Sequence, residues 1–102
     1  MSGKKREEYR LFITEKIQKF LKSLDGKSQR IIRNNLKKLV TNPYPDSGKG
    51  DKEKLSLPDE DIYRLHIGRS WTAFYVIIED EQQIRITEIM TIDKAHKKYG
   101  DL

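Results

Sequence analysis

The chain has 102 residues, which suits one domain, and it contains no cysteine. A chain without cysteine holds no disulfide framework and no thiolate metal site. No apolar run approaches the ~20 residues of a membrane span, and the first residues lead into no signal-type apolar stretch. Hydrophobic residues make up 35% and charged residues 36% of the chain. We therefore expect one soluble, cytoplasmic globular domain over residues 1–102, with no membrane association.

The formal net charge is +5, and it is unevenly distributed along the sequence. Residues 1–54 carry 15 Lys and Arg against 7 Asp and Glu, whereas residues 55–102 carry 6 against 9. A basic balance favours an anionic partner, of which nucleic acid is the commonest. A lysine-rich, solvated helical surface gives the same balance, so charge alone leaves both interpretations open.

Local patterns predict a strand and two helices in the first half of the chain. Residues 9–13 (YRLFI) alternate polar and apolar side chains and predict a strand. Thr14 can cap the next helix, which residues 25–26 end, with Gly26 able to adopt the left-handed conformation. Ser28 begins a second helix, which residues 42–43 (Asn-Pro) close. The two apolar stripes at helical spacing consist of Ile17, Phe20, Leu21 and Leu24, and of Ile32, Leu36, Leu39 and Val40.

The second half of the chain changes to the two-residue period of strands. After an exposed loop over residues 42–54, strands are predicted over residues 54–57, 62–67, 71–79 and 83–92. The order β-α-α-β-β-β-β predicts an α+β fold, in which two helices pack on one face of an antiparallel β-meander. Residues 71–78 are apolar on both faces. The second face of the sheet is therefore partly covered, either by the C-terminal tail or by a partner.

Two basic side chains share one face of the predicted strand over residues 62–67. Alternation places Arg64 and His66 side by side, on the face that we expect to be free of helices. Both side chains would then project from an exposed surface, and replacement of Arg64 would cost little stability. An ordinary strand face with solvated polar residues is the alternative interpretation.

Residues 93–100 (DKAHKKYG) combine basic groups with an aromatic ring. Cations hold phosphates while a ring stacks on an unpaired base, so this combination suits RNA. A frayed, solvated tail with Tyr99 pinned to the core explains the same residues. The basic-capable residues of the segment are Lys94, His96, Lys97 and Lys98.

Searches for other chemistry give no candidate. Residues 48–50 (Gly-Lys-Gly) lack the flanking strand and helix of a phosphate-binding loop. His66 and His96 have no spaced set of carboxylate partners. The sequence therefore predicts no metal site and no cofactor.

Three segments together resemble a known family. They are YRLFITEKIQKFLKSLD at residues 9–25, KLSLPDEDIYRLHIG at residues 54–68 and ITEIMTIDKAHKKYG at residues 86–100. In these segments, and in its order of elements, the chain resembles the RelE/ParE superfamily of toxin–antitoxin toxins, on the RelE side. The resemblance implies a ribosome-dependent endoribonuclease that cleaves mRNA and inhibits translation. It also implies a RelB-like antitoxin that wraps the toxin and inactivates it.

The resemblance also implies roles for individual residues. Arg64 and His66 fall where the family often has two basic residues on its third strand. Tyr99 falls at a near-C-terminal tyrosine, and Lys94 lies near a late arginine. These four are the implied catalytic residues. The implied RNA-binding residues are Arg69, His96, Lys97 and Lys98.

One position departs from the family pattern. Many active members have an arginine shortly after the aromatic that opens the fourth strand, whereas here Trp71 is followed by Thr72. Two alternatives therefore stay open beside a metal-independent endoribonuclease. One is a ParE-like toxin that inhibits DNA gyrase and cleaves nothing, and the other is a catalytically inactive relative that only binds a partner or operator DNA.

Overall fold

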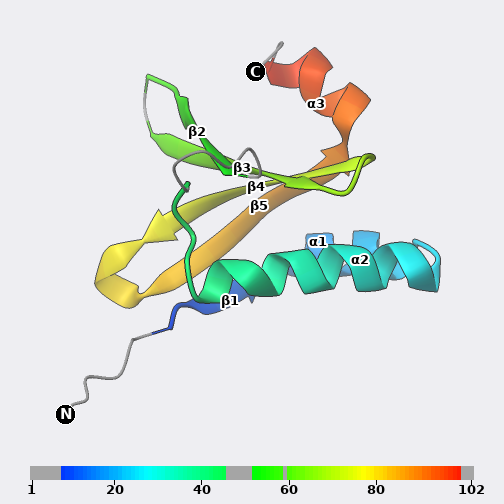
Figure 1. Ribbon diagram of the computed structural model, residues 1–102, viewed down its shortest axis with the longest axis horizontal. Helices are drawn as coiled ribbons and strands as arrows, with labels where there is room; N and C mark the ends of the chain where they lie inside the picture. Colours follow the sequence, from blue (N-terminus) through cyan, green and yellow to red (C-terminus); the bar gives the residue numbers. More distant parts are fainter. Residues whose placement is uncertain (1–7, 46–51, 59, 100–102) are drawn as a thin grey trace.

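The computed structural model describes residues 8–45, 52–58 and 60–99, and these form one five-stranded sheet with three α-helices (Figure 1). The strand order across the sheet is β1-β5-β4-β3-β2. Among the described residues, no helix is long and apolar enough to cross a membrane. The elements are β1 (Arg10–Ile13), α1 (Glu15–Lys22), α2 (Gly26–Lys37), β2 (Lys52–Ser56), β3 (Asp61–Ile67), β4 (Trp71–Ile78), β5 (Gln83–Thr91) and α3 (Ile92–Tyr99), with 3-10 turns at Lys38–Val40 and Glu79–Glu81.

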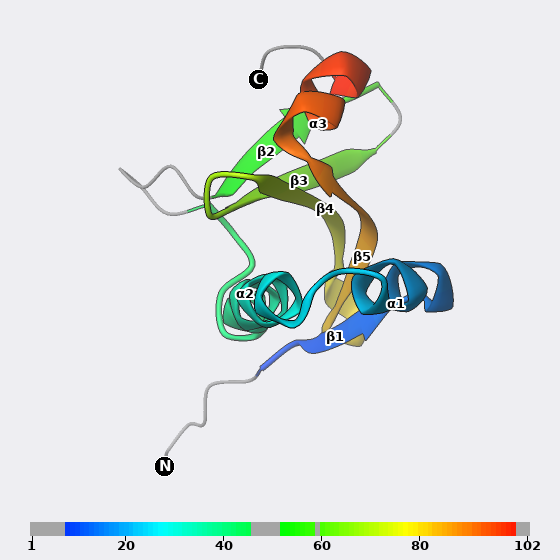
Figure 2. The ribbon, with the colours of Figure 1, turned by 90° about the vertical axis from the view of Figure 1, so that its right-hand side faces the viewer.

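The predicted α+β class and the order of the first seven elements are confirmed. Strands β2 to β5 form the antiparallel meander, and β1 joins its far edge parallel to β5. Helices α1 and α2 pack on one face of the sheet, and α3 lies on the opposite face (Figures 1 and 2). The sequence predicts a basic tail for the residues of α3, and this prediction is wrong because they form a helix. The second face is covered by the chain's own C-terminal segment.

The junction between α1 and α2 is built differently from the prediction. Thr14 caps α1 as expected, since its hydroxyl accepts from the Ile17 amide over 3.3 Å. Gly26, however, is the first residue of α2 and does not end α1 in the left-handed conformation. Asp25 is the N-cap of α2, because its carboxylate accepts from the Ser28 amide over 3.2 Å. An aspartate satisfies an unpaired first-turn amide, so the second helix begins two residues earlier than predicted.

The larger core lies between the two long helices and the sheet. Its buried helical residues are Ile17, Leu21, Ile32, Leu36 and Leu39, and its buried sheet residues include Leu65, Ile67, Tyr75, Ile84 and Ile86. The predicted apolar stripes of both helices are therefore confirmed as core-facing, except at Val40, which is half-buried and lies outside this core.

The predicted exposed loop over residues 42–54 is confirmed at residues 42–45 except for Pro43, and it is wrong from Lys52 onward. Pro43 is buried, and its carbonyl accepts a 2.6 Å hydrogen bond from the Tyr75 hydroxyl. Strand β2 begins at Lys52 because the segment pairs with β3 up to Leu65. Because β2 (KEKLS) consists mainly of charged residues, it lacks the apolar alternation that predicts a strand. Residues 46–51, including the Gly-Lys-Gly stretch, lie outside the described residues.

Low pH is expected to weaken the hydrogen bonds that the Glu79 carboxylate accepts from two tyrosine hydroxyls. The hydroxyls of Tyr44 and Tyr9 donate to its carboxylate, and these two bonds lower its pKa. Because the pKa is lower in the folded state, the stabilisation is present above the unfolded-state pKa and is lost as pH falls through the folded-state pKa. Glu79→Gln should therefore flatten the acid side of the stability profile, measured by urea denaturation across acidic and neutral pH. An unchanged profile would contradict this role for Glu79.

Candidate functional site

Helix α3 closes a second, smaller apolar cluster against the face of the sheet opposite α1 and α2. Its buried members are Leu55, Ile62, Phe74 and Ala95, one from each of β2, β3, β4 and α3. Tyr99 and Met90 pack at its margin. The basic helix is thus fixed on the sheet by apolar contacts, and its polar residues surround them.

A row of side chains runs across four strands beneath this helix. In register, Glu53 of β2 lies opposite Arg64 of β3, Arg64 opposite Phe74 of β4, and Phe74 opposite Glu88 of β5. The pairing of β4 with β5 then skips Thr87, which forms a bulge and donates its hydroxyl to the Phe74 carbonyl over 3.2 Å. A bulge reverses the alternation of the strand that carries it. Glu88 consequently lies on the α3 face with the rest of the row.

Arg64 is on the predicted face of the sheet, but the prediction that it is exposed is wrong. Its side chain is 2% exposed, and α3 lies on the same face of the sheet. The guanidinium pairs with the Glu53 carboxylate, whose side chain is 42% exposed. The Arg64 Nε has no hydrogen-bond partner among the described residues. The structure therefore holds a buried cation with one carboxylate partner and one unused donor.

Tyr99 joins α3 to this row. Its ring centroid lies 4.6 Å from that of Phe74, and its hydroxyl donates to Glu88 Oε1 over 3.1 Å. Lys98 Nζ contacts Glu88 Oε2 at 2.6 Å. Burial and the bond to Glu88 raise the pKa of Tyr99, so its hydroxyl stays protonated near neutral pH. The tail is helical rather than frayed, and the expectation that Tyr99 is pinned to the core is confirmed.

The other predicted site residues are more exposed. On α3, Lys94, His96 and Lys97 lie on the solvent side, and Arg69 is exposed in the turn after β3. His66 is half-buried, two residues beyond Arg64 on the same strand face. The structure thus brings Arg64, Lys98 and Tyr99 together at one row. It places the remaining five around α3 and the end of β3.

Two carboxylates of the row, Glu53 and Glu88, were not singled out from the sequence. The pairing of Glu53 with Arg64 follows from the β2–β3 hairpin register, which the sequence signals only weakly. The position of Glu88 depends on the bulge at Thr87, which carries no local signal. These carboxylates set the charge of the site, because one neutralises Arg64 and the other anchors Lys98.

The departure at Thr72 also has a structural counterpart. Thr72 is 1% exposed and pairs with His66 on one side and Met90 on the other. An arginine in this position would have to be buried beside the small cluster under α3. The cations of this face therefore come from β3 and α3. Among the described residues, no group of three or more His, Asp or Glu is arranged to hold a metal ion.

Comparison with known proteins gives structural matches only. No protein-family model and no curated sequence matches the chain. A chain of the archaeal RelE–RelB complex from Pyrococcus horikoshii OT3 aligns with a TM-score of 0.67 and 26% identity, over 81% of this chain and 93% of that one. The isolated E. coli RelE toxin aligns with a TM-score of 0.55 and 15% identity, over 88% and 97%. The intact E. coli RelBE complex aligns with a TM-score of 0.52 and 15% identity, over 80% and 94%.

These likenesses cover 81% and 88% of this chain and agree with the predicted element order. The fold places the chain in the RelE-type toxin superfamily.

Proposed function

We propose that the chain is the toxin of a toxin–antitoxin pair and that it cleaves mRNA on the ribosome. The observation that carries the proposal is Arg64, a buried cation with an unused donor, on the sheet face that the basic helix α3 covers. A buried arginine with an unused Nε donor is suited to a phosphate, since a guanidinium whose carboxylate partner is displaced binds a phosphate through two parallel hydrogen bonds. In the described structure, the Glu53 carboxylate pairs with the guanidinium that would bind this phosphate.

Cleavage of RNA by its own 2′-oxygen needs only a few catalytic groups. The 2′-oxygen of one nucleotide attacks the adjacent phosphorus, the bond to the 5′-oxygen breaks, and a 2′,3′-cyclic phosphate remains. A base accepts the 2′ proton, an acid protonates the departing 5′-oxygen, and cations stabilise the extra negative charge of the transition state. Arg64 and Lys94 supply charge, and His66 or His96 supplies an imidazole to accept or donate a proton. Tyr99 supplies a ring for stacking and a protonated hydroxyl.

The burial of Arg64 explains why such a site would need the ribosome. A phosphate reaches this side chain only when Glu53 releases it and α3 moves from the row. The cations of this surface do not by themselves orient the 2′-oxygen of an RNA for attack on the phosphorus. A ribosome that holds the mRNA in one geometry would supply that orientation. We therefore expect weak cleavage of free RNA, and we expect the protein to act in the cytoplasm, where translation takes place.

The partner is a protein antitoxin. Two of the structural matches are complexes of a RelE protein with RelB, and this chain carries a net charge of +5 that an acidic partner would neutralise. Induced expression of the chain alone should arrest growth. Co-expression with the product of the neighbouring small open reading frame should restore it. Unimpaired growth with the folded chain present would contradict the proposal.

Charge reversal on α3 should reveal the surface that binds RNA. Lys94→Glu with Lys97→Glu removes two exposed cations of the proposed site, and ribosome binding should weaken with a shallower salt dependence, because fewer counterions are released. Lys27→Glu with Lys37→Glu makes the same charge change on α2, on the other side of the sheet. Filter binding over a salt series measures both. Equal losses for the two pairs would indicate diffuse attraction instead of a site.

A further inference from the structure

Helix α3 covers only part of the sheet face that lies opposite α1 and α2. It lies away from β1 and from the turn between β4 and β5 (Figures 1 and 2). On this part of the face, Phe12 of β1 pairs with Arg85 of β5, and Arg85 pairs with Val76 of β4. Two residues along, Arg10 of β1 and Ile78 of β4 lie on the same face, one on each side of β5. These five residues form what we call the β1 strip.

The ring of Phe12 and the guanidinium of Arg85 form a cation–π pair on the surface. Leu11 and Ile13 pack against the larger core, so alternation turns Phe12 between them to the other face, where it is 45% exposed. Arg85 Cζ lies 5.6 Å from the centre of the ring, and Arg85 Nη2 donates to Gln83 Oε1 over 3.0 Å. The exposed guanidinium is therefore held beside an exposed aromatic ring.

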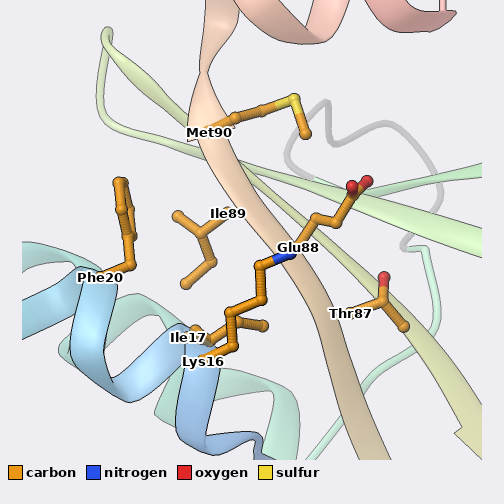
Figure 3. Close-up of a pocket in the computed structure, with 7 residues that line it drawn as sticks. All are labelled: Lys16, Ile17, Phe20, Thr87, Glu88, Ile89 and Met90. Carbon is orange, nitrogen blue, oxygen red and sulfur yellow. The ribbon is translucent and has the colours of Figure 1, made fainter.

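The arginines of the β1 strip keep their positive charge available for an anion. Both are exposed, and within the described residues no carboxylate pairs with Arg10 or Arg85. Glu88, further along β5, points away from α1 (Figure 3), but Lys98 holds its carboxylate. The anion that balances the two arginines therefore has to come from a partner.

Single-stranded RNA has the chemistry that fits the β1 strip. An unpaired base stacks on an aromatic ring or on a guanidinium plane, while arginines bind the phosphates beside it. Double-stranded RNA keeps its bases stacked on one another and offers the ring no free base. A second copy of this chain fits poorly, because a symmetric contact would bring Arg10 and Arg85 of both copies together.

We infer that the β1 strip binds the mRNA strand beside the cleavage site, with one base stacked on the pair of Phe12 and Arg85 and a neighbouring phosphate held by Arg10. The inference rests on the proposed function, since it extends the path of the same substrate. The β1 strip is exposed, so this contact forms without any movement of α3.

The position of the β1 strip indicates which part of the mRNA it contacts. Arg64 and Phe12 lie on strands that are three spacings apart, and their rows are two residues apart on β4. At about 5 Å per strand spacing and about 3.3 Å per residue, roughly 16 Å separates the two positions. A base on Phe12 therefore belongs to a nucleotide a few positions from the scissile phosphate. The β1 strip contributes to affinity and to the choice of site, and not to bond breaking.

Fluorescence anisotropy with a short, labelled oligoadenylate and the full chain tests the stacking. Phe12→Leu keeps an apolar side chain but removes the ring, so binding should weaken about tenfold. Phe12→Tyr keeps a ring and should bind like the original chain. Ile31→Ala is the matched control, because Ile31 is 38% exposed on α2, and it should leave the Kd unchanged. Equal Kd values for Phe12→Leu and the original chain would overturn the inference.

Arg85→Gln tests the charge of the β1 strip in the same assay. It should weaken binding and make the salt dependence shallower, because fewer counterions are released. Arg30→Gln removes the same charge from an exposed position on α2, on the other side of the sheet, and should have a much smaller effect. Equal losses for the two variants would mean diffuse attraction and would overturn the inference.

Two further measurements separate this inference from its rivals. If the original chain cuts mRNA on translating ribosomes while Phe12→Leu binds RNA unchanged, the inference is overturned and the proposed function stands. An original chain that neither binds RNA nor cuts mRNA overturns both. Sedimentation tests the remaining occupant. If Phe12→Leu lowers the molecular mass in solution and leaves RNA binding intact, the β1 strip is a contact between copies, and the inference is overturned.

Discussion

Arg64→Ala should lower the free energy of unfolding by about 3 kcal/mol, near the low end for breaking a buried ion pair. The Arg64 side chain is 2% exposed, so its loss leaves a cavity and strips Glu53 of its partner. The half-exposed Glu53 can be rehydrated, which keeps the loss from being larger. Urea denaturation measures the change. An effect near zero would mean that the arginine contributes little packing, as expected of an exposed position.

A second variant separates the contribution of Arg64 to protein stability from its proposed role in mRNA cleavage. Arg64→Met combined with Glu53→Gln keeps much of the buried volume and removes both charges. Such replacements are often neutral for stability. Cleavage of mRNA should nevertheless fall by roughly 10²–10³-fold, by analogy with the loss of one transition-state donor. If the folded double variant cleaves like the original chain, the guanidinium does not bind the reacting phosphate.

Tyr99→Ala should release α3 from the sheet. The substitution removes the ring that packs 4.6 Å from Phe74 and the hydrogen bond to Glu88. Because Tyr99 is partly exposed, we expect a loss of about 2 kcal/mol, below the 3–5 kcal/mol typical of a fully buried aromatic. Hydrogen exchange should become faster in α3 while α1 and α2 keep their protection. Unchanged exchange in α3 would show that other contacts hold this helix.

Tyr99→Phe distinguishes two roles of the ring. It keeps the packing on Phe74 and loses only the bond to Glu88, so its cost in stability should be about 1 kcal/mol. Cleavage close to that of the original chain indicates stacking or packing. A large loss of cleavage, with the fold intact, indicates that the hydroxyl takes part in the reaction.

The element order could be predicted because its signals are local. The stripes of α1 and α2, the alternation in β3 and the apolar run of β4 each lie within one element, and those elements are confirmed. The helix α3 was missed because few apolar residues mark it. Ala95 and Tyr99 pack on the sheet, while the basic residues between them resemble a solvated tail.

The site could be predicted only in part, for a related reason. Alternation correctly placed Arg64 on the face opposite the long helices, but its burial and its pairing with Glu53 depend on tertiary contacts that alternation does not indicate. The contribution of Glu88 depends on a bulge that shifts the strand by one residue. Contacts between residues far apart in the sequence determine which side chains meet at the site. Local periodicity does not predict such contacts.

Primer extension on mRNA in a purified translation reaction tests the central claim most directly. The folded chain should cut the message within the ribosomal A site when ribosomes are translating, and it should leave the same RNA nearly intact without them. A DNA supercoiling assay with gyrase runs in parallel and should show no inhibition. A folded chain that cuts nothing on translating ribosomes, or that inhibits gyrase instead, would contradict the proposed function and the roles given to Arg64, His66, Lys94 and Tyr99.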